Sequence, residues 1–227
     1  MSASIWAILV AAGRGERLGG ERPKAFADLG GRPLLAESLE RLDACARIEG
    51  IVVAAPPDWE EAVILLAEEL GCEKVSLVVS GGATRTDSVR LALAEVPPEV
   101  GLILVHDAAR PLVDETVVER VIAALEEGWQ GAVPALPLAD TVKRVEAETV
   151  VETPDRSSLV AVQTPQGFLA ETLRSAYAEA TEEASDCASL VEARGGRVTC
   201  VEGDPRLRKV TTPEDLALVA GWLAKER

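Results

Sequence analysis

The chain has 227 residues, a formal net charge of −15 at pH 7 and a hydrophobic fraction of 48%. This length favours one medium-sized domain that can bury a sizeable core. The acidic balance argues against nonspecific binding to nucleic acid or to an anionic membrane surface. No apolar run of about 18 residues occurs, so no membrane span is expected. No basic region precedes the first apolar run, so no signal peptide is expected.

Apolar, β-branched runs alternate with amphipathic segments along the chain. Strands are predicted at residues 5–10, 51–55, 75–80, 102–106, 132–135 and 198–201. Helices are predicted at residues 33–45, 59–70, 86–95, 114–127 and 171–179. A last helix is expected after Thr212, which can cap it, with Pro213 in its first turn. Near-continuous hydrophobic strands separated by helices predict an α/β fold with a mostly parallel sheet covered on both faces.

One region, residues 138–162, breaks this alternation. It is polar and β-branched, which favours a two-stranded arm that leaves the body. An isolated hairpin is marginally stable in water, so we expect the arm to pack on a second copy of the chain. A hairpin folded back on its own sheet is the alternative. The predicted organisation is a single domain, 1–227, with a dimerisation arm at about 138–162 and a homodimer as the assembly.

A basic loop with two glycines follows the first predicted strand. Its sequence is Ala11-Ala12-Gly13-Arg14-Gly15-Glu16-Arg17, and Arg22-Pro23-Lys24 comes shortly after. Exposed backbone amides combined with cations suit a polyphosphate. The spacing does not match a dinucleotide fingerprint, because Leu18 stands where the third glycine belongs. The Gly-Lys-Ser/Thr of a P-loop is also missing. The alternative is a surface loop that happens to be basic.

Two further strand ends carry glycine or charged residues. The third predicted strand is followed by Gly81, Gly82, Arg85, Asp87 and Ser88, and the fourth ends in His106-Asp107-Ala108-Ala109-Arg110-Pro111. Ligands of open parallel sheets bind beyond the carboxyl ends of the strands, so we expect one site that these ends share.

Asp107 is the best candidate for a metal ligand. A carboxylate at a strand end beside a phosphate-binding loop suits Mg²⁺, which prefers oxygen ligands. The alternative is an aspartate that caps a turn or pairs with Arg110. His106, the only histidine, is expected to be structural, because no second histidine is present to complete a metal cluster.

The four cysteines, at positions 45, 72, 187 and 200, are widely separated and form no C-x-x-C pair. This spacing disfavours a zinc site or a redox motif and favours reduced thiols. We therefore expect a cytoplasmic protein.

Several motifs occur together in the order of one known family. They are Ala-Ala-Gly-x-Gly-x-Arg at 11–17 with Pro23-Lys24, Gly-Gly-x-x-Arg-x-Asp-Ser-Val at 81–89, His-Asp-Ala-Ala-Arg-Pro at 106–111, Asp140-Thr141-Val142-Lys143, Asp155-Arg156, Gln163-Thr164-Pro165-Gln166 and Lys209-Val210-Thr211-x-Pro213-Glu214-Asp215. Each piece is weak alone, but the series is specific and covers essentially the full length. The chain resembles the 2-C-methyl-D-erythritol 4-phosphate cytidylyltransferases of the non-mevalonate isoprenoid pathway. The resemblance implies a three-layer, Rossmann-like nucleotidyltransferase fold with a protruding β-arm.

The resemblance further implies a cytidylyl transfer. CTP and methylerythritol phosphate, a polyol phosphate, would give a CDP-alcohol and pyrophosphate with Mg²⁺ as cofactor. The substrate phosphate would attack the α-phosphorus in line, without a covalent enzyme intermediate. A phosphomonoester dianion is already a competent nucleophile, so the difficulty lies in bringing two polyanions together and stabilising charge at phosphorus.

Roles for individual residues also follow from the resemblance. Catalytic roles fall on Arg17, Lys24, Arg156 and Lys209, with Arg156 reaching the site from the partner subunit. Nucleotide binding falls on Ala11, Ala12, Gly13, Gly15, Gly81, Gly82, Asp87, Ser88, Asp107 and Ala108. Substrate binding falls on Thr141, Arg156, Thr164, Ser185 and Lys209, and Asp107 would face Mg²⁺. The alternative for Lys24, Lys209 and Arg156 is that they are solvated surface charges.

The chain departs from the family pattern at a few positions. Val10 and Ala25 stand where the family often has proline and glutamine, and Leu207-Arg208 replaces Asn-Ile before Lys209. In the segment 185–189, Ser185 can retain a hydroxyl but Cys187 replaces a carboxylate. Two rival functions stay open: a cytidylyltransferase for ribitol 5-phosphate or another polyol phosphate, and a non-catalytic nucleotide-sensing protein. A sensor is expected to have lost Lys24 or Lys209, and both are present.

Overall fold

An eight-stranded sheet forms the centre of the part of the chain that the computed structural model describes, which is residues 3–19, 22–180 and 183–226. Seven strands follow one another in the order β10-β5-β9-β4-β1-β2-β3, and β8 pairs with β5. The strands are β1 (Ile5–Val10), β2 (Gly50–Ala55), β3 (Val75–Ser80), β4 (Leu102–Asp107), β5 (Gly131–Pro137), β8 (Val160–Val162), β9 (Gln166–Leu169) and β10 (Val198–Glu202). All six strands that the sequence predicts are present.

The sheet is mostly parallel, as predicted. The neighbours of β1 are β2 and β4, and both pairs are parallel. The exceptions are β9, which is antiparallel to β4 and β5, and β8, which is antiparallel to β5. The sequence analysis missed both strands because they are short and β9 begins with the polar pair Gln166-Gly167, which carries no strand periodicity.

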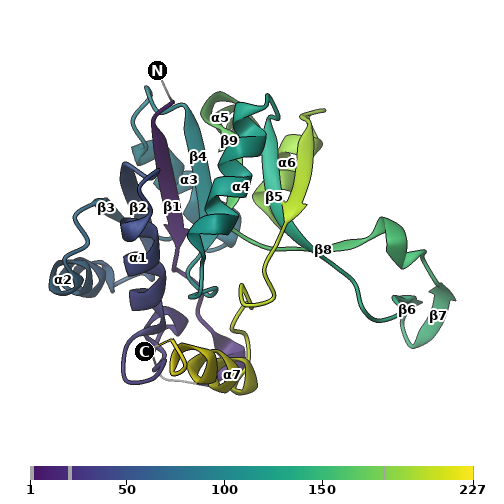
Figure 1. The fold of residues 1–227 in the computed structure, drawn as a ribbon, viewed down its shortest axis with the longest axis horizontal. Helices are drawn as coiled ribbons and strands as arrows, with labels where there is room; N and C mark the ends of the chain where they lie inside the picture. The colour runs from purple at the N-terminus through teal and green to yellow at the C-terminus, as the bar shows by residue number, and fades with distance from the viewer. Residues whose placement is uncertain (1–2, 20–21, 181–182, 227) are drawn as a thin grey trace.

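Helices cover both faces of the sheet (Figure 1). On one face lie α1 (Leu34–Ala44), α2 (Glu60–Leu70) and α4 (Glu115–Glu126), and on the other lie α3 (Arg85–Glu95), α5 (Ala170–Ala178) and α6 (Cys187–Glu192). Side chains of β1 alternate between the two cores, with Ala7 and Leu9 in the first and Ile8 in the second. The three layers of the predicted fold are therefore confirmed.

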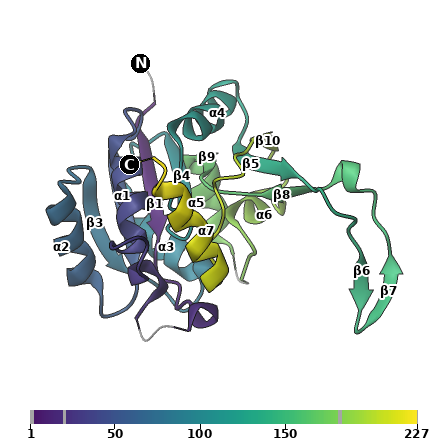
Figure 2. The same cartoon turned by 60° about the horizontal axis from the view of Figure 1, so that its bottom comes forward.

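A further helix, α7 (Pro213–Leu223), lies beyond the carboxyl ends of the parallel strands (Figures 1 and 2). Its start is the predicted one, because the Thr212 and Asp215 side chains form a reciprocal capping box with Pro213 in the first turn. A small third core packs α7 against the N-terminal region through Leu29, Leu34 and Val219. The described ranges also contain three short 3-10 turns, η1 (Glu16–Leu18), η2 (Lys24–Phe26) and η3 (Arg156–Ser158).

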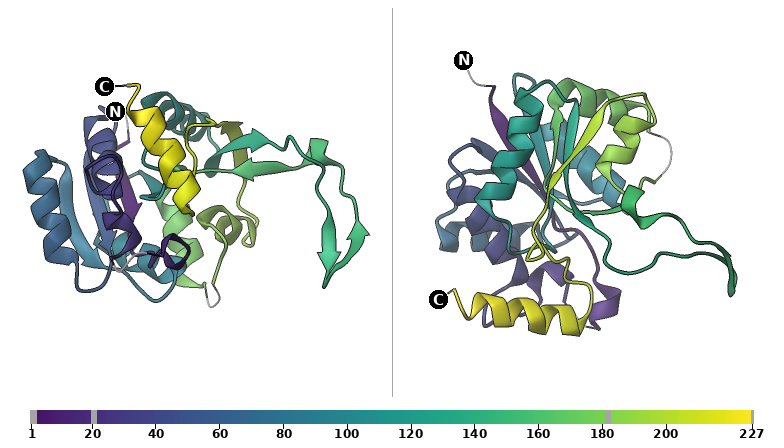
Figure 3. Two further views of the ribbon diagram at one scale, coloured as in Figure 1. Left: turned by 90° about the horizontal axis from the view of Figure 1, so that it is seen from below. Right: turned by 45° about the vertical axis from the view of Figure 1, so that its right-hand side comes forward.

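The predicted arm projects from the body (Figures 1 and 3). Its hairpin consists of β6 (Arg144–Glu146) and β7 (Thr149–Glu152), which pair with each other in a separate two-stranded sheet. The alternative of a hairpin folded back on its own sheet is therefore wrong. The predicted range 138–162 is slightly too long for the free arm, because β8 at its end belongs to the main sheet. Three hairpin valines, Val145, Val150 and Val151, are exposed.

No helix within the described ranges is both long and apolar enough to cross a membrane.

Candidate active site

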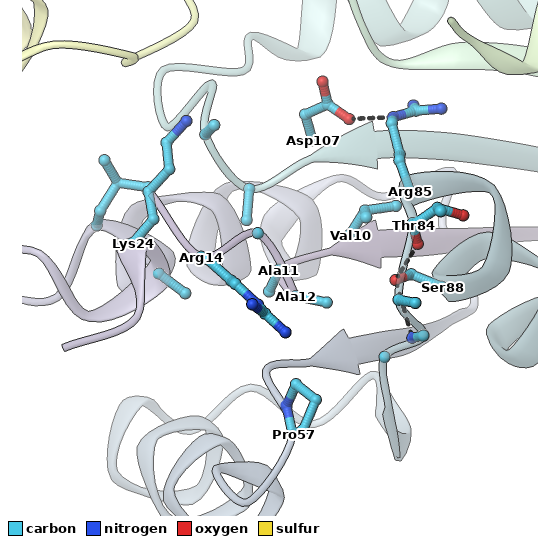
Figure 4. Close-up of a pocket in the computed structure, with 18 of the residues that line it drawn as sticks. Val10, Ala11, Ala12, Arg14, Lys24, Pro57, Thr84, Arg85, Ser88 and Asp107 are labelled. Carbon is cyan, nitrogen blue, oxygen red and sulfur yellow. Dashed lines mark hydrogen bonds and ion pairs between the residues drawn. The ribbon is translucent and has the colours of Figure 1, made fainter. Parts of the chain in front are cut away.

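A cavity of about 360 Å³ lies at the carboxyl ends of β1, β3 and β4 (Figure 4). Its walls come mainly from the loop after β1, the turn between β3 and α3, and the end of β4, with single residues from α1 (Leu34) and from the segment after β2 (Pro57). The segment before α7 contributes Lys209. The strand ends that the sequence analysis singled out therefore do share one site. The lining residues are Val10, Ala11, Ala12, Gly13, Arg14, Lys24, Ala25, Leu34, Pro57, Gly81, Gly82, Ala83, Thr84, Arg85, Ser88, Asp107, Ala108, Ala109 and Lys209.

The loop after β1 wraps around Lys24. Gly15 adopts the left-handed conformation with φ of 72°, which residues with a side chain rarely adopt. A Cβ atom at Gly15 would lie 2.6 Å from Cβ of Lys24. Gly15 itself does not line the cavity, whereas Lys24 does. The glycine allows the loop to pack closely against Lys24.

The turn between β3 and α3 brings backbone close to backbone. A Cβ atom at Gly81 would lie 2.2 Å from Cβ of Ala12, so only glycine fits between the two loops. The Ser88 hydroxyl donates to the Thr84 carbonyl at 2.8 Å and accepts from the Gly82 amide at 3.1 Å. These bonds hold the turn against the loop after β1 and shape one wall of the cavity.

The floor of the cavity carries a carboxylate between two cations. Asp107 Oδ1 accepts from Nε of Arg85 at 2.9 Å, and Asp107 Oδ2 accepts from Nζ of Lys209 at 2.7 Å. Burial alone would raise the pKa of the Asp107 carboxyl, but the charges of Arg85 and Lys209 outweigh it and hold that pKa well below its usual range. The alternative pairing of Asp107 with Arg110 is not what the structure shows.

The segment that presents Lys209 is fixed by two contacts just before the lysine. Arg110 donates to the Leu207 carbonyl at 2.7 Å, and Leu207 is fully buried. The Arg208 guanidinium donates to Asp215 Oδ1 at 2.8 Å, which ties the segment to the first turn of α7. Leu207 and Arg208, two of the departures from the family pattern, thus both anchor the backbone on the N-terminal side of Lys209.

Lys24 lies in a cationic environment. Burial, together with the nearby charge of Lys209, lowers the pKa of its ammonium group to about 8, although Asp107 opposes the shift. Arg17 also lowers this pKa through its charge. Arg17 is exposed in η1 and does not line the cavity, but its charge acts there. A partly buried lysine whose charge is disfavoured by neighbouring cations indicates a site that suits an anion.

The cavity offers few protein ligands for a magnesium ion. Among the described residues that line the cavity, Asp107 is the single carboxylate. The described residues hold no group of three or more His, Cys, Asp or Glu side chains that could form a metal cage. Mg²⁺ commonly uses one or two carboxylates and takes its other ligands from substrate phosphates and water. The residues present therefore fit a magnesium ion that Asp107 would hold together with the phosphates of a substrate.

His106 is structural, as expected. It is fully buried, and its ring nitrogens contact the Arg110 carbonyl at 3.0 Å and the Thr164 hydroxyl at 3.1 Å. Burial lowers the pKa of His106 to about 4, so the ring is neutral at physiological pH. The same Thr164 hydroxyl accepts from the Asp107 amide at 3.1 Å. Thr164, a predicted substrate residue, therefore lies behind Asp107 and supports the end of β4.

The cavity brings together most of the predicted nucleotide residues and two of the predicted catalytic ones. The predicted residues that line it are Ala11, Ala12, Gly13, Lys24, Gly81, Gly82, Ser88, Asp107, Ala108 and Lys209. Asp87 does not line it: its carboxylate accepts from Thr84 at 2.9 Å and from Arg90 at 2.7 Å. Ser185 is exposed in front of α6.

The arm residues lie apart from the cavity in this single chain. Thr141 and Arg156 are exposed, and the Arg156 guanidinium donates to the Ala139 carbonyl. Neither residue lines the cavity.

Sequence reasoning missed Pro57 and Thr84, and it named Arg14 and Arg85 only as members of charged loops, without an individual role. For Arg85 a signal was present, because it follows the third strand within the glycine motif. Its partner, however, lies 22 positions away on another strand, and no local pattern shows that pairing.

An open, mostly parallel sheet with an anion-binding cavity at its carboxyl edge defines the chain as a nucleotide-binding α/β protein. A family model for 2-C-methyl-D-erythritol 4-phosphate cytidylyltransferase matches residues 5–225. The chain is 49% identical over 225 residues to the protein of that name from Frankia casuarinae, covering 99% of this chain and 83% of the relative. It is also 49% identical to the one from Saccharopolyspora erythraea, covering 97% of this chain and all of the relative.

Solved structures agree with these relatives. The 2-C-methyl-D-erythritol 4-phosphate cytidylyltransferase of Thermus thermophilus superimposes with a TM-score of 0.79 at 37% identity, covering 96% of this chain and 98% of that one. The 4-diphosphocytidyl-2C-methyl-D-erythritol synthase of Anaerococcus prevotii reaches a TM-score of 0.84 at 27% identity, covering 98% and 99%. The chain belongs to the 2-C-methyl-D-erythritol 4-phosphate cytidylyltransferase family, and the resemblance found in its motifs is confirmed.

Proposed function

We propose that the protein transfers the cytidylyl group of CTP to 2-C-methyl-D-erythritol 4-phosphate, forming 4-diphosphocytidyl-2-C-methyl-D-erythritol and pyrophosphate. Membership of the family supports this activity. The structural observation that carries it is the cavity in which Lys24 and Lys209 meet beside the glycine-containing loops. Such a cavity suits polyanionic substrates better than a neutral ligand.

The chemistry is a phosphoryl-type displacement. An oxygen of the substrate phosphate forms a bond to the α-phosphorus of CTP, the bond from that phosphorus to the bridging oxygen breaks, and pyrophosphate leaves. No proton has to be removed from a phosphate dianion, so the protein needs charge and position rather than a strong base. Lys24, with Arg17 nearby, is proposed to stabilise the charge on the α-phosphate and on the leaving pyrophosphate.

The nucleotide is proposed to bind against the small residues of the two loops. Ala11, Ala12, Gly81 and Gly82 leave room for a base and a ribose, and their backbone groups are available for hydrogen bonds. Ser88 stiffens this wall through its bonds to the turn. Magnesium, held by Asp107 and the triphosphate, would supply Lewis-acid stabilisation of the phosphate charge.

Lys209 is proposed to hold the incoming polyol phosphate, with Arg156 and Thr141 reaching the same phosphate from a partner subunit. The projecting hairpin and its exposed valines support a homodimer formed through the arm. We also propose a cytoplasmic location. The four cysteines are free thiols, which is consistent with a reducing compartment.

The test is pyrophosphate release by purified protein with Mg²⁺. CTP, UTP, ATP and GTP are each offered with methylerythritol 4-phosphate or with ribitol 5-phosphate. Release that requires CTP and methylerythritol phosphate is the expected result. A preference for ribitol 5-phosphate would leave the reaction type unchanged and replace the assigned substrate. Nucleotide binding without release from any pair would contradict the proposal and indicate a sensor.

A further inference from the structure

Arg85 stands at an unusual place for a cation. It is the first residue of α3, and the N-terminal end of a helix favours negative rather than positive charge. Helix formation therefore does not account for an arginine here. Its side chain turns instead toward the cavity floor, where it lies beside Asp107 (Figure 4).

The Arg85 guanidinium makes two directional contacts. Nε donates to Asp107 Oδ1 at 2.9 Å, and Nη1 donates to the Cys187 sulfur at 3.5 Å. The Cys187 sulfur lies 3.2 Å from the Tyr177 hydroxyl. Burial raises the pKa of both the Cys187 thiol and the Tyr177 phenol, so this side of Arg85 is neutral. Among the described residues, Asp107 is the one carboxylate in ion-pair contact with Arg85.

The other oxygen of Asp107 holds Lys209. Two cations thus share one carboxylate, and the group keeps one net positive charge. Without Arg85, the Asp107 and Lys209 charges would cancel, and Asp107 could rotate away from the lysine. A planar guanidinium suits this position because its fork contacts the carboxylate and the thiol at the same time, which a lysine cannot do.

We propose that Arg85 is a positioning residue for the transfer reaction. It fixes the Asp107 carboxylate and, through it, the Lys209 ammonium, and its charge keeps Lys209 available to the incoming phosphate. This inference rests on the proposed role of Lys209 in holding the polyol phosphate. It concerns that subsite rather than the nucleotide wall, which Ala12, Gly81 and Ser88 form.

The test compares Arg85→Gln, which removes the charge, with Arg85→Lys, which retains it without the fork. For Arg85→Gln we expect kcat to fall about 10- to 100-fold and KM for the polyol phosphate to rise about tenfold. The affinity for CTP alone, measured by calorimetry without Mg²⁺ so that Asp107 is not linked to the triphosphate through a metal ion, should stay within about threefold, because the nucleotide wall is untouched. Arg85→Lys should recover part of the loss.

Two further variants serve as controls, and thermal unfolding is followed for all of them. Cys187→Ser retains a neutral partner for Arg85 and should keep activity within about threefold. Arg194→Ala removes an arginine from an ion pair with Glu179 that does not border the cavity, and should leave the kinetics unchanged. If Arg85→Gln does not fold, Arg85→Lys still tests whether the guanidinium geometry is needed. In that variant KM for the polyol phosphate should rise while the affinity for CTP stays unchanged.

Three results would overturn the inference. One is a lowered unfolding temperature with unchanged kinetics, which would make Arg85 a purely structural residue. Another is a loss of CTP affinity with unchanged kcat, which would make it a direct nucleotide contact. The third is full activity in Arg85→Gln. Wild-type protein assayed alongside separates the two proposals, because absence of turnover by the wild type would count against the proposed function itself.

Discussion

The ammonium group of Lys209 lies 2.7 Å from Oδ2 of Asp107, although 102 positions separate the two residues in the chain. This contact joins the last segment before α7 to the end of the central strand β4. It places the lysine ammonium at a defined point of the cavity, where, in the proposed function, a substrate phosphate oxygen takes over or shares its contact with Asp107. The cavity is therefore completed by the C-terminal part of the chain.

Replacing Lys24 by alanine should lower kcat by roughly 10²–10³, the range seen when one preorganised charge donor is removed. The free energy of unfolding should change little, because the lysine is only partly buried and lies among other cations. Pyrophosphate release and urea unfolding check the two halves of this prediction. Lys225→Ala, at an exposed position near the C-terminus, is the matched control. Activity within threefold of wild type in Lys24→Ala would contradict the assignment.

The affinity for CTP should depend on pH through Lys24. Its pKa is lowered to about 8, so the side chain is charged below that pH and loses its proton as the pH rises through it. A bound triphosphate favours the charged form, so affinity should be highest below pH 8 and weaken above it. The loss of one charge-assisted contact corresponds to roughly 10- to 100-fold in affinity. Calorimetry between about pH 7 and 9.5 measures the effect, and an equally steep profile in Lys24→Ala would show that another group titrates.

Mixing two inactive variants should test where the arm acts. If Arg156 serves the partner's cavity, a dimer of one Lys24→Ala chain and one Arg156→Ala chain contains one site with neither change. Random exchange of equal amounts makes half of the dimers mixed, so about a quarter of the wild-type activity should return. Subunit exchange is verified with differently tagged chains. No recovery after verified exchange would mean that the arm serves its own subunit.

Glycine at position 81 should be required for the shape of the cavity. In Gly81→Ala the new methyl group would lie 2.2 Å from Cβ of Ala12 and 2.9 Å from the Ala55 carbonyl oxygen. Two backbone segments would have to separate, which we expect to cost about 1–3 kcal/mol of stability and to weaken CTP binding. Gly221→Ala, with no atom within 4 Å of the new Cβ, should instead stabilise α7 by about 0.5–1 kcal/mol. Denaturant unfolding and CTP calorimetry measure both, and equal effects of the two changes would contradict this account.

The sequence by itself determined the strands, most of the helices and the edge of the sheet where the site lies. These features are local: apolar runs, a capping box at Thr212 and glycines beside cations are visible within a few residues of one another. The same local signal predicted the arm, because its polar and β-branched pattern differs from that of the buried strands. It did not predict β9, whose burial depends on its neighbours β4 and β5 rather than on its own periodicity.

Only the tertiary structure decided which charges meet. Asp107 was expected to face a metal ion, and the structure adds that Arg85 and Lys209 share its two oxygens. The neutral contact of Cys187 with Arg85 is likewise invisible in the sequence, since 102 residues separate them. Ion pairs of this kind depend on the order of strands in the sheet, which places distant segments at one edge. Hydrophobic periodicity determines where each helix or strand forms. The order of the strands in the sheet determines which polar side chains at the strand ends come into contact.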